Sequence, residues 1–276
     1  MFVELFFPYF VFFIFGTFVG SFINVLIYRI PRYESFVFPS SHCTRCGKIL
    51  GFFDLIPVLS WLCTGGRCHY CAGSVSFIYP FIEILEGFIF MFAYHIYKGE
   101  PFFIVKCIVM LSFFVVISAL DIKFQIIPDG LNLILFLTGI VFCILGTFLS
   151  VKEAYLPFFD SYLLDGLFAS FAGGGFLWAI GFLGEKIFKR PAMGGGDVKL
   201  AIALGFFVGY KVLIAGLFLS FFLGAFFGIL LMIITLNRRS TYIPFGPYIF
   251  FSVCMVYIMG EKNLGILWGH LEDLLH

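Results

Sequence analysis

The feature that most constrains this chain is a series of long apolar runs separated by short polar connections. A helix needs ~20 consecutive apolar residues to cross a bilayer. We place runs of about this kind at 5–28, 75–97, 102–120, 131–149, 163–183, 212–236 and 245–259, with a shorter one at 198–209. Only 12% of the residues are charged, against roughly 25% in soluble domains. The sequence therefore predicts an all-α polytopic membrane protein.

The number of spans depends on the short run at 198–209. As a helix it would reach about 18 Å, less than the ~30 Å hydrocarbon core. If it crosses, and if the N-terminus lies outside, most Lys and Arg residues fall on the inner side, as the positive-inside rule requires. These inner residues are Arg29, Arg32, Arg45, Lys48, Arg67, Lys123, Lys186, Lys189, Arg190, Lys199, Arg238 and Arg239. We therefore predict about eight transmembrane helices.

Three regions follow from this topology. Residues 1–30 are a first transmembrane helix, which we read as retained because no basic residue precedes its apolar core. Residues 31–74 are the one long polar stretch and are expected in the cytoplasm. Residues 75–276 form the remaining membrane core.

Two acidic residues stand at the ends of apolar runs. Asp121 ends a run directed inward, and Asp197 follows three glycines at the start of a run directed outward, so both are expected at the cytoplasmic boundary. Ionisable residues at membrane depth indicate function by default. Two carboxylates at close range share a proton, so that one can accept a proton from water while the other donates to a carbonyl oxygen. This is the chemistry of an aspartic protease.

Each acid also has a purely structural interpretation. Asp197 could cap a helix, and Asp121 could lie at the water interface paired with Lys123. Asp129, between a proline and a glycine, is typical of a turn or cap. Spacing along the chain does not decide between these interpretations.

The polar stretch contains two CxxC pairs, Cys43 with Cys46 and Cys68 with Cys71, separated by 21 residues. Thiolates at this spacing can close a tetrahedral shell around zinc, as in a zinc ribbon, and the metal supplies folding energy to a small loop. Two disulfides are the alternative, but disulfides rarely persist in the cytoplasm. Cys63 fits neither pair. We expect a small zinc-ribbon-like loop, while the four thiolates do not distinguish zinc from iron.

The motifs taken in order resemble those of the bacterial type 4 prepilin peptidases, also called leader peptidase/N-methyltransferases, over nearly the whole chain. The motifs that carry the resemblance are Gly20–Pro31, the twin CxxC loop, Tyr79–Glu83, Asp121 with Ile127–Asp129, Gly194–Asp197 and Pro244–Pro247. Each motif is short, so the resemblance depends on their common order. The segment 150–162 is longer than is usual for the family, and it is expected on the outer side.

The resemblance implies that Asp121 and Asp197 are the catalytic pair of an intramembrane aspartyl protease and that the four cysteines hold structural zinc. It implies a multi-pass protein of the bacterial inner membrane that cuts the basic leader from type 4 prepilins or pseudopilins at the cytoplasmic face. It also implies N-methylation of the new N-terminal residue, with S-adenosylmethionine as donor. We name no residues for the donor, because no glycine-rich nucleotide-binding fingerprint occurs and Gly173–Gly175 is better explained by helix packing.

Other functions remain open at this point. A proton-coupled transporter or channel would also use acids at the boundary, although we see no internal repeat of the kind that many transporters show. A membrane scaffold would explain the cysteines but not the acids. Glu83 and Glu86 share a helix face and could orient a substrate or pair with loop arginines. The formal net charge of +1 argues against nucleic acid as a partner, and the oligomeric state stays unknown.

Overall fold

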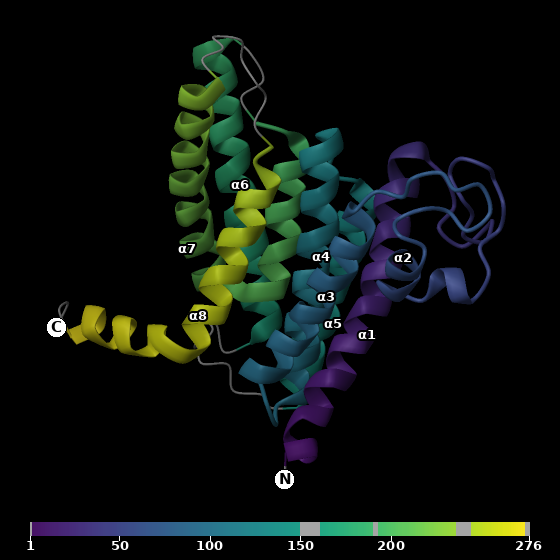
Figure 1. The fold of residues 1–276 in the computed structure, drawn as a ribbon. Coiled ribbons are helices and arrows are strands. Elements are labelled where there is room, and N and C mark those ends of the chain that lie inside the picture. The colour runs from purple at the N-terminus through teal and green to yellow at the C-terminus, as the bar shows by residue number, and fades with distance from the viewer. Residues whose placement is uncertain (1, 150–160, 190–192, 236–243, 274–276) are drawn as a thin grey trace. The chain divides into compact units, whose positions relative to one another are not determined.

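The computed structural model describes residues 2–149, 161–189, 193–235 and 244–273, and helices make up the regular secondary structure of these ranges (Figure 1). The α-helices are α1 (Phe2–Arg29), α2 (Leu59–Cys63), α3 (Ile78–Ile96), α4 (Pro101–Phe124), α5 (Asp129–Phe148), α6 (Tyr162–Phe188), α7 (Gly195–Thr235) and α8 (Gly246–Asp273). Two short 3-10 helices, η1 (Ile30–Arg32) and η2 (Phe53–Leu55), lie in the polar stretch. No strand occurs in the described ranges, which hold only two isolated β-bridges.

Six of the described helices, namely α1 and α3 to α7, are long and apolar enough to cross a membrane, and α8 begins with a shorter apolar segment, Gly246–Gly260. Helices are the expected solution because a span must satisfy all its backbone polar groups internally. The predicted all-α polytopic membrane protein is confirmed. The insertion at 150–162 falls almost wholly outside the described residues.

The chain divides into two compact units, residues 1–116 and 117–276, with the boundary inside α4. In the first unit, α1 and α3 pack closely together at two glycine residues of α1. A Cβ atom on Gly16 would lie 2.4 Å from the carbonyl oxygen of Glu86, and one on Gly20 would lie 2.6 Å from the Cα atom of Glu83. Larger residues at these two positions would force the helices apart.

Arg29 fixes the polar stretch to the end of α1. Arg29 as a whole is 4% exposed, and its guanidinium donates hydrogen bonds to the carbonyl oxygens of Ser35, at 2.8 Å, and of Pro39, at 2.7 Å. From the sequence, Arg29 counted only as one of the basic residues that indicate the inner side of the membrane. The structure shows that it also satisfies backbone acceptors where the loop leaves the helix.

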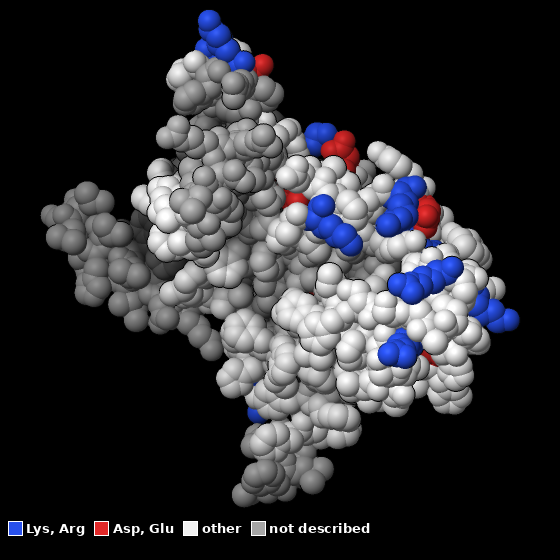
Figure 2. Space-filling model, turned by 45° about the horizontal axis from the view of Figure 1, so that its top comes forward, with Lys and Arg blue, Asp and Glu red and all other residues white. Residues whose placement is uncertain are grey.

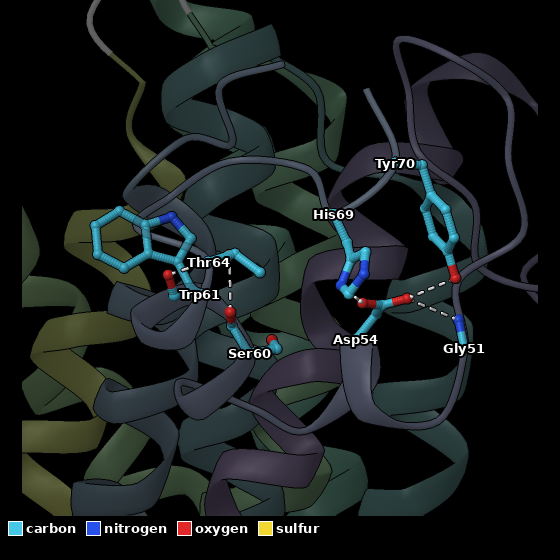
Figure 3. Close-up of polar contacts among 7 residues, drawn as sticks. All are labelled: Gly51, Asp54, Ser60, Trp61, Thr64, His69 and Tyr70. Carbon is cyan, nitrogen blue, oxygen red and sulfur yellow. Dashed lines mark hydrogen bonds and ion pairs between the residues drawn. The ribbon is translucent and has the colours of Figure 1, made fainter. Parts of the chain in front are cut away.

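Asp54 organises the middle of the same loop (Figure 3). Its Oδ2 accepts hydrogen bonds from the backbone N–H of Gly51 and from the hydroxyl of Tyr70, both at 3.0 Å. The Nδ1 atom of His69 lies 3.8 Å from Oδ1 of Asp54. The bond to Asp54 is the main reason why the pKa of Tyr70 is raised above its ordinary value. Asp54 thus links η2 to the second CxxC pair.

In the second unit, α7 is two helical arms joined at Gly209, whose φ of 77° and ψ of 175° are not helical. The chain reverses there, as the contacts along α6 show. Along the first arm, contacts with α6 move toward the beginning of α6: Ile202 faces Gly174, Gly205 faces Ser170, and Gly209 faces Asp165. After the break the contacts move back, because Leu213 and Leu217 both face Gly173. Glycines 173 and 174 therefore serve helix packing, as predicted.

The first arm of α7, residues 195–208, is about 21 Å long at 1.5 Å per residue, and this is short for a span, as the sequence predicted. Counting the two arms separately and adding α8 gives eight apolar helical segments. That the short arm crosses the bilayer stays a prediction.

Asp165 stabilises the break in α7. The residue is 7% exposed, and its Oδ2 accepts a hydrogen bond of 3.1 Å from the backbone N–H of Tyr210, the first residue after the break. The second arm thus receives an N-terminal cap from a different helix. A Cβ atom on Gly209 would lie 2.5 Å from the same Oδ2, so this position also needs glycine for space.

Candidate functional site

Asp121 lies in the last turn of α4 and is held by the beginning of α8. Its side chain is 4% exposed, and Oδ2 accepts a hydrogen bond of 3.1 Å from the backbone N–H of Gly246. Gly246 is the first residue of α8. The N-terminus of a helix carries partial positive charge and free N–H groups, so it favours a nearby carboxylate.

Asp197 lies in the first turn of the short arm of α7. It is also 4% exposed, and among the described residues its buried Oδ1 has no hydrogen-bond partner. The carboxyl groups of Asp121 and Asp197 are close enough to repel each other when both are charged. The structure therefore brings together the two acids that the sequence pairs, although 76 positions separate them in the numbering.

Ile127 packs between the helix starts that carry this site. A Cβ atom on Gly196 would lie 3.0 Å from Cβ of Ile127, and one on Gly246 would lie 2.9 Å from its Cδ1. The Gly246 Cβ would also lie 2.7 Å from Oδ2 of Asp121. Only glycine at 196 and 246 lets these starts approach Ile127 and the acid so closely.

Asp129, the third acid of the region, is not part of the pair. It begins α5 and is exposed, and its Oδ1 lies 2.7 Å from Nζ of Lys199 on α7. An exposed ion pair of this kind contributes at most ~1 kcal/mol. The structural interpretation of Asp129 fits this position. The alternative of an ion pair between Asp121 and Lys123 is not found among the described residues, because Asp121 is turned to α8.

The four cysteines of the CxxC pairs form one cluster in the first unit. Cys43, Cys46, Cys68 and Cys71 place their Sγ atoms within 4.8 Å of one another, and the Sγ atoms of Cys43 and Cys71 are 4.0 Å apart. A tetrahedral zinc site with bonds of about 2.3 Å requires sulfur atoms about 3.8 Å apart. The donors therefore fit zinc, and they do not form disulfides. Cys63 lies outside the cluster, as expected, and so do His42 and His69.

The two CxxC pairs repeat one backbone structure. In each, the N–H of the first cysteine donates to the carbonyl oxygen five residues later, at Lys48 and Gly73 respectively. The residue after the second cysteine, Gly47 or Ala72, donates back to the first cysteine and has a left-handed φ, of 70° and 54° respectively. This is the turn that points two thiols to one side, and two such turns facing each other make the cluster.

The electrostatics of the cluster favour a cation. The backbone N–H groups of Cys46 and Arg45 lower the pKa of the Cys43 thiol to about 6, because they stabilise its thiolate. At Cys71 the Gly73 N–H acts in the same sense, but desolvation and hydrogen bonds with the neighbouring thiols outweigh it and raise the pKa to about 11. One thiolate therefore makes the ionisation of a neighbouring thiol less favourable. A bound metal ion removes this penalty, because its positive charge stabilises the thiolates together.

Glu83 and Glu86 have partners within the first unit. Oε2 of Glu83 accepts a hydrogen bond of 2.7 Å from the backbone N–H of Val58, and Oε2 of Glu86 accepts one of 2.9 Å from the hydroxyl of Ser112. Oε1 of Glu86 is buried without a partner among the described residues. Glu83 thus attaches the loop to α3, and neither glutamate forms an ion pair with a loop arginine in the described part of the chain.

Sequence reasoning missed the backbone donor to Asp121 and one buried polar residue of α5. It quoted Gly246 as part of a short motif but had no signal for the bond to Asp121, 125 positions away. Asn132, on α5, is 5% exposed, and neither Nδ2 nor Oδ1 has a partner among the described residues. A lone asparagine in an apolar run was the only available signal.

Comparison with known proteins agrees with both units. Residues 14–97 match the model of the bacterial peptidase A24 N-terminal domain, and residues 108–229 match that of the type IV leader peptidase family.

Among curated proteins, the chain is 32% identical to a prepilin leader peptidase/N-methyltransferase of Bacillus subtilis, covering 91% of this chain and 94% of that one. It is 33% identical to one of Myxococcus xanthus, covering 81% of this chain and 63% of that protein, and 29% identical to one of Aeromonas hydrophila, covering 91% and 90%. No solved structure shows significant similarity to the chain.

Proposed function

We propose that this chain, which belongs to the type IV leader peptidase family, is an intramembrane aspartyl endopeptidase that removes the basic leader of type 4 prepilins or pseudopilins. The observation that carries the proposal is the burial of Asp121 and Asp197 next to each other at the ends of apolar helices, with Asp121 on the N-terminus of α8. A buried pair of carboxyl groups in a membrane protein is costly and is retained for function.

We propose a role for each acid from its surroundings. Asp121 accepts the Gly246 N–H at a helix N-terminus, which stabilises its negative charge, so Asp121 is the base. The backbone of Gly194 also hydrogen-bonds to Asp197, but its buried Oδ1 has no partner among the described residues and it faces the charge of Asp121, so we take Asp197 to hold the proton that the pair shares.

In the reaction, Asp121 takes a proton from a water molecule whose oxygen attacks the scissile carbonyl carbon. Asp197 gives its proton to the carbonyl oxygen, which forms a neutral tetrahedral intermediate. When the C–N bond breaks, Asp121 returns its proton to the leaving amine and Asp197 recovers its own from the hydroxyl. No covalent bond to the protein forms, and the pair ends in its starting state.

The membrane placement supports a substrate that is itself a membrane helix. The prepilin's apolar helix would pack among the spans while its basic leader stays in the cytoplasm, which puts the scissile bond at the level of the two acids. The positive-inside rule, applied to the chain's own Lys and Arg residues, favours the cytoplasmic face for this level, and the family supports the bacterial inner membrane as its location.

The four-cysteine cluster is proposed as a structural zinc site. Cys43, Cys46, Cys68 and Cys71 would hold the ion, which when bound supplies folding energy to a loop with few buried apolar residues. The protein's proposed hydrolysis uses only the two carboxyl groups and water, so the metal has no part in that chemistry.

We also propose the second activity that the names of the relatives give, methylation of the new N-terminal amine with S-adenosylmethionine. The N-terminal domain match, residues 14–97, includes the cysteine loop. The relatives named for both activities match 91% of this chain, which supports both activities here, and no residue is assigned to the methyl donor.

The test uses the purified full chain in liposomes with a prepilin and S-adenosylmethionine, and mass spectrometry of the products. The wild type should release the leader and add one methyl group. Asp121→Asn and Asp197→Asn should abolish cleavage because each removes one proton-transferring carboxyl group. The matched control Asp129→Asn should cleave normally, since that acid is exposed and pairs with Lys199.

Cleavage by either of the first two variants would contradict the proposed pair. A wild type that cleaves no prepilin offered would favour the alternative of a proton-coupled transporter.

A further inference from the structure

The loop of the first unit carries large apolar side chains on its outside. Phe52 and Phe53 are each 79% exposed, and Leu59 and Leu62, one turn apart on α2, are 58% and 59% exposed. Leu55, at 40%, lies between them in sequence. We call these five residues the apolar loop surface. Large exposed apolar side chains gathered on one small loop indicate a surface that is covered in use.

The position of this surface shows what covers it. The backbone N–H of Val58, directly before α2, donates to Glu83, which is five residues inside α3 and hence about 7.5 Å along the span from its first residue. α2 is therefore level with the first turns of a membrane-spanning helix, and Figure 1 shows it beside the upper part of α1. At that level the surroundings of the protein are lipid.

A series of contacts between aromatic rings connects α2 to the exposed side of α3. The ring of Trp61 lies 5.8 Å from that of Phe77, which lies 6.4 Å from that of Phe81. Phe77, directly before α3, is 60% exposed, and Phe81, on α3, is 52% exposed. The indole N–H of Trp61 donates to the carbonyl oxygen of Val75. Tryptophan with a satisfied polar end and an apolar ring is typical of the membrane interface.

The charges of the loop agree with a membrane surface. Arg45, Lys48 and Arg67 are all exposed, and Figure 2 shows Lys and Arg side chains spread over this part of the molecule with few acids between them. Basic side chains near a bilayer attract anionic headgroups, at about 1 kcal/mol each in general.

We propose that the apolar loop surface is inserted into the interface of the lipid bilayer, so that the loop lies on the membrane and does not extend into the cytoplasm. The arrangement is that of interfacial segments, which bury apolar side chains ~5–10 Å into the boundary between headgroups and acyl chains and keep basic side chains at the phosphates. The surface thereby holds the cysteine cluster close to the membrane, and the inference does not depend on the proposed catalysis.

The experiment replaces Leu62, and in a second protein Leu59, by a diazirine-bearing leucine analogue in the full chain. Each protein is reconstituted in liposomes of phosphatidylcholine and phosphatidylglycerol and irradiated, and the adducts are read by mass spectrometry. The matched control carries the analogue at Thr44, an exposed residue in the first CxxC turn. We expect a gain of one phospholipid mass at 62 and 59, and mainly the water adduct at 44, because a side chain next to Arg45 lies at the level of the hydrated headgroups and not among the acyl chains.

The absence of a phospholipid adduct at both leucine positions would overturn the proposal. So would an adduct with a second copy of the chain, or with an added prepilin, because it would assign the surface to a protein partner. Retention of the metal by each variant shows that the loop is folded. Leader cleavage is measured separately on the same proteins, so failure of this proposal is distinguishable from failure of the proposed function.

Discussion

Replacement of Gly246 by alanine tests how α8 holds Asp121. The added Cβ atom would lie 2.7 Å from Oδ2 of Asp121 and 2.9 Å from Cδ1 of Ile127, distances that real Cβ atoms do not show. The end of the Asp121 side chain has to move, and this weakens its 3.1 Å hydrogen bond with the Gly246 N–H. A hydrogen bond to a charged group contributes roughly 1.5–3 kcal/mol.

If that bond keeps Asp121 charged and oriented during proton transfer, its loss slows cleavage by about 10- to 150-fold, at 1.36 kcal/mol per factor of ten. The rate is measured as release of the prepilin leader in liposomes under single-turnover conditions, so that product release does not hide the chemical step. The fold should persist, because the clash is with the movable end of a side chain and not with backbone.

Gly130→Ala is the matched control. A Cβ atom there meets no atom within 4 Å, and alanine in the first turn of α5 is favourable for the helix. Gly130→Ala should therefore cleave at the wild-type rate. If Gly246→Ala does so too, then the start of α8 does not set the working position of Asp121, and the assignment of Asp121 as the base loses its physical support.

Five further variants test other parts of the structure. Asp165→Ala should lower stability by about 1 kcal/mol, seen as a lower thermal midpoint in detergent, because it removes the cap of the second arm of α7; an unchanged midpoint would contradict this role. Ala72→Gly should stabilise the metal-bound loop by roughly 1 kcal/mol, because a left-handed residue with a Cβ atom is strained, and Gly47→Ala should destabilise it by a similar amount. If the wild type and these two variants resist chelators equally, the result argues against the repeated turn. Cys46→Ser should lose the metal by elemental analysis and expose residues 31–74 to proteolysis, whereas a retained metal would remove Cys46 from the ligands. Asn132→Leu should raise the thermal midpoint, because burying an amide without partners costs about 1–3 kcal/mol; a lower midpoint would mean that the amide is satisfied in the membrane.

The spans and the pairing of the acids could be predicted because each depends on a single strong physical term. The length of an apolar run decides whether a helix can cross the bilayer, and the alternation of run directions then puts Asp121 and Asp197 at the same boundary. The CxxC spacing was similarly sufficient, since two short turns with inward thiols leave few arrangements other than a four-thiolate site. In each case local sequence fixes the geometry.

The contacts between distant helices could not be predicted in this way. Nothing near Asp165 indicates that its carboxylate receives the N–H of Tyr210, because the need for a cap arises only from the break at Gly209. Arg29 gave no sign of its three carbonyl partners in the loop, since backbone acceptors leave no residue pattern. The exposed phenylalanines of the loop could not be recognised from the sequence, because the chain contains 43 phenylalanines and these do not stand out among them.

The motifs around Gly196 and Gly246 gain a common meaning from the structure. Both are helix starts, and in both the absence of a side chain makes room for Ile127, which follows the α4 helix that carries Asp121. One start places Asp197 in its first turn and the other donates its N–H to Asp121. The two acids are therefore positioned by one packed contact of three segments and not by two independent motifs. It follows that enlarging or shrinking Ile127 should disturb both acids together, although Ile127 itself has no polar atom to contribute to the reaction.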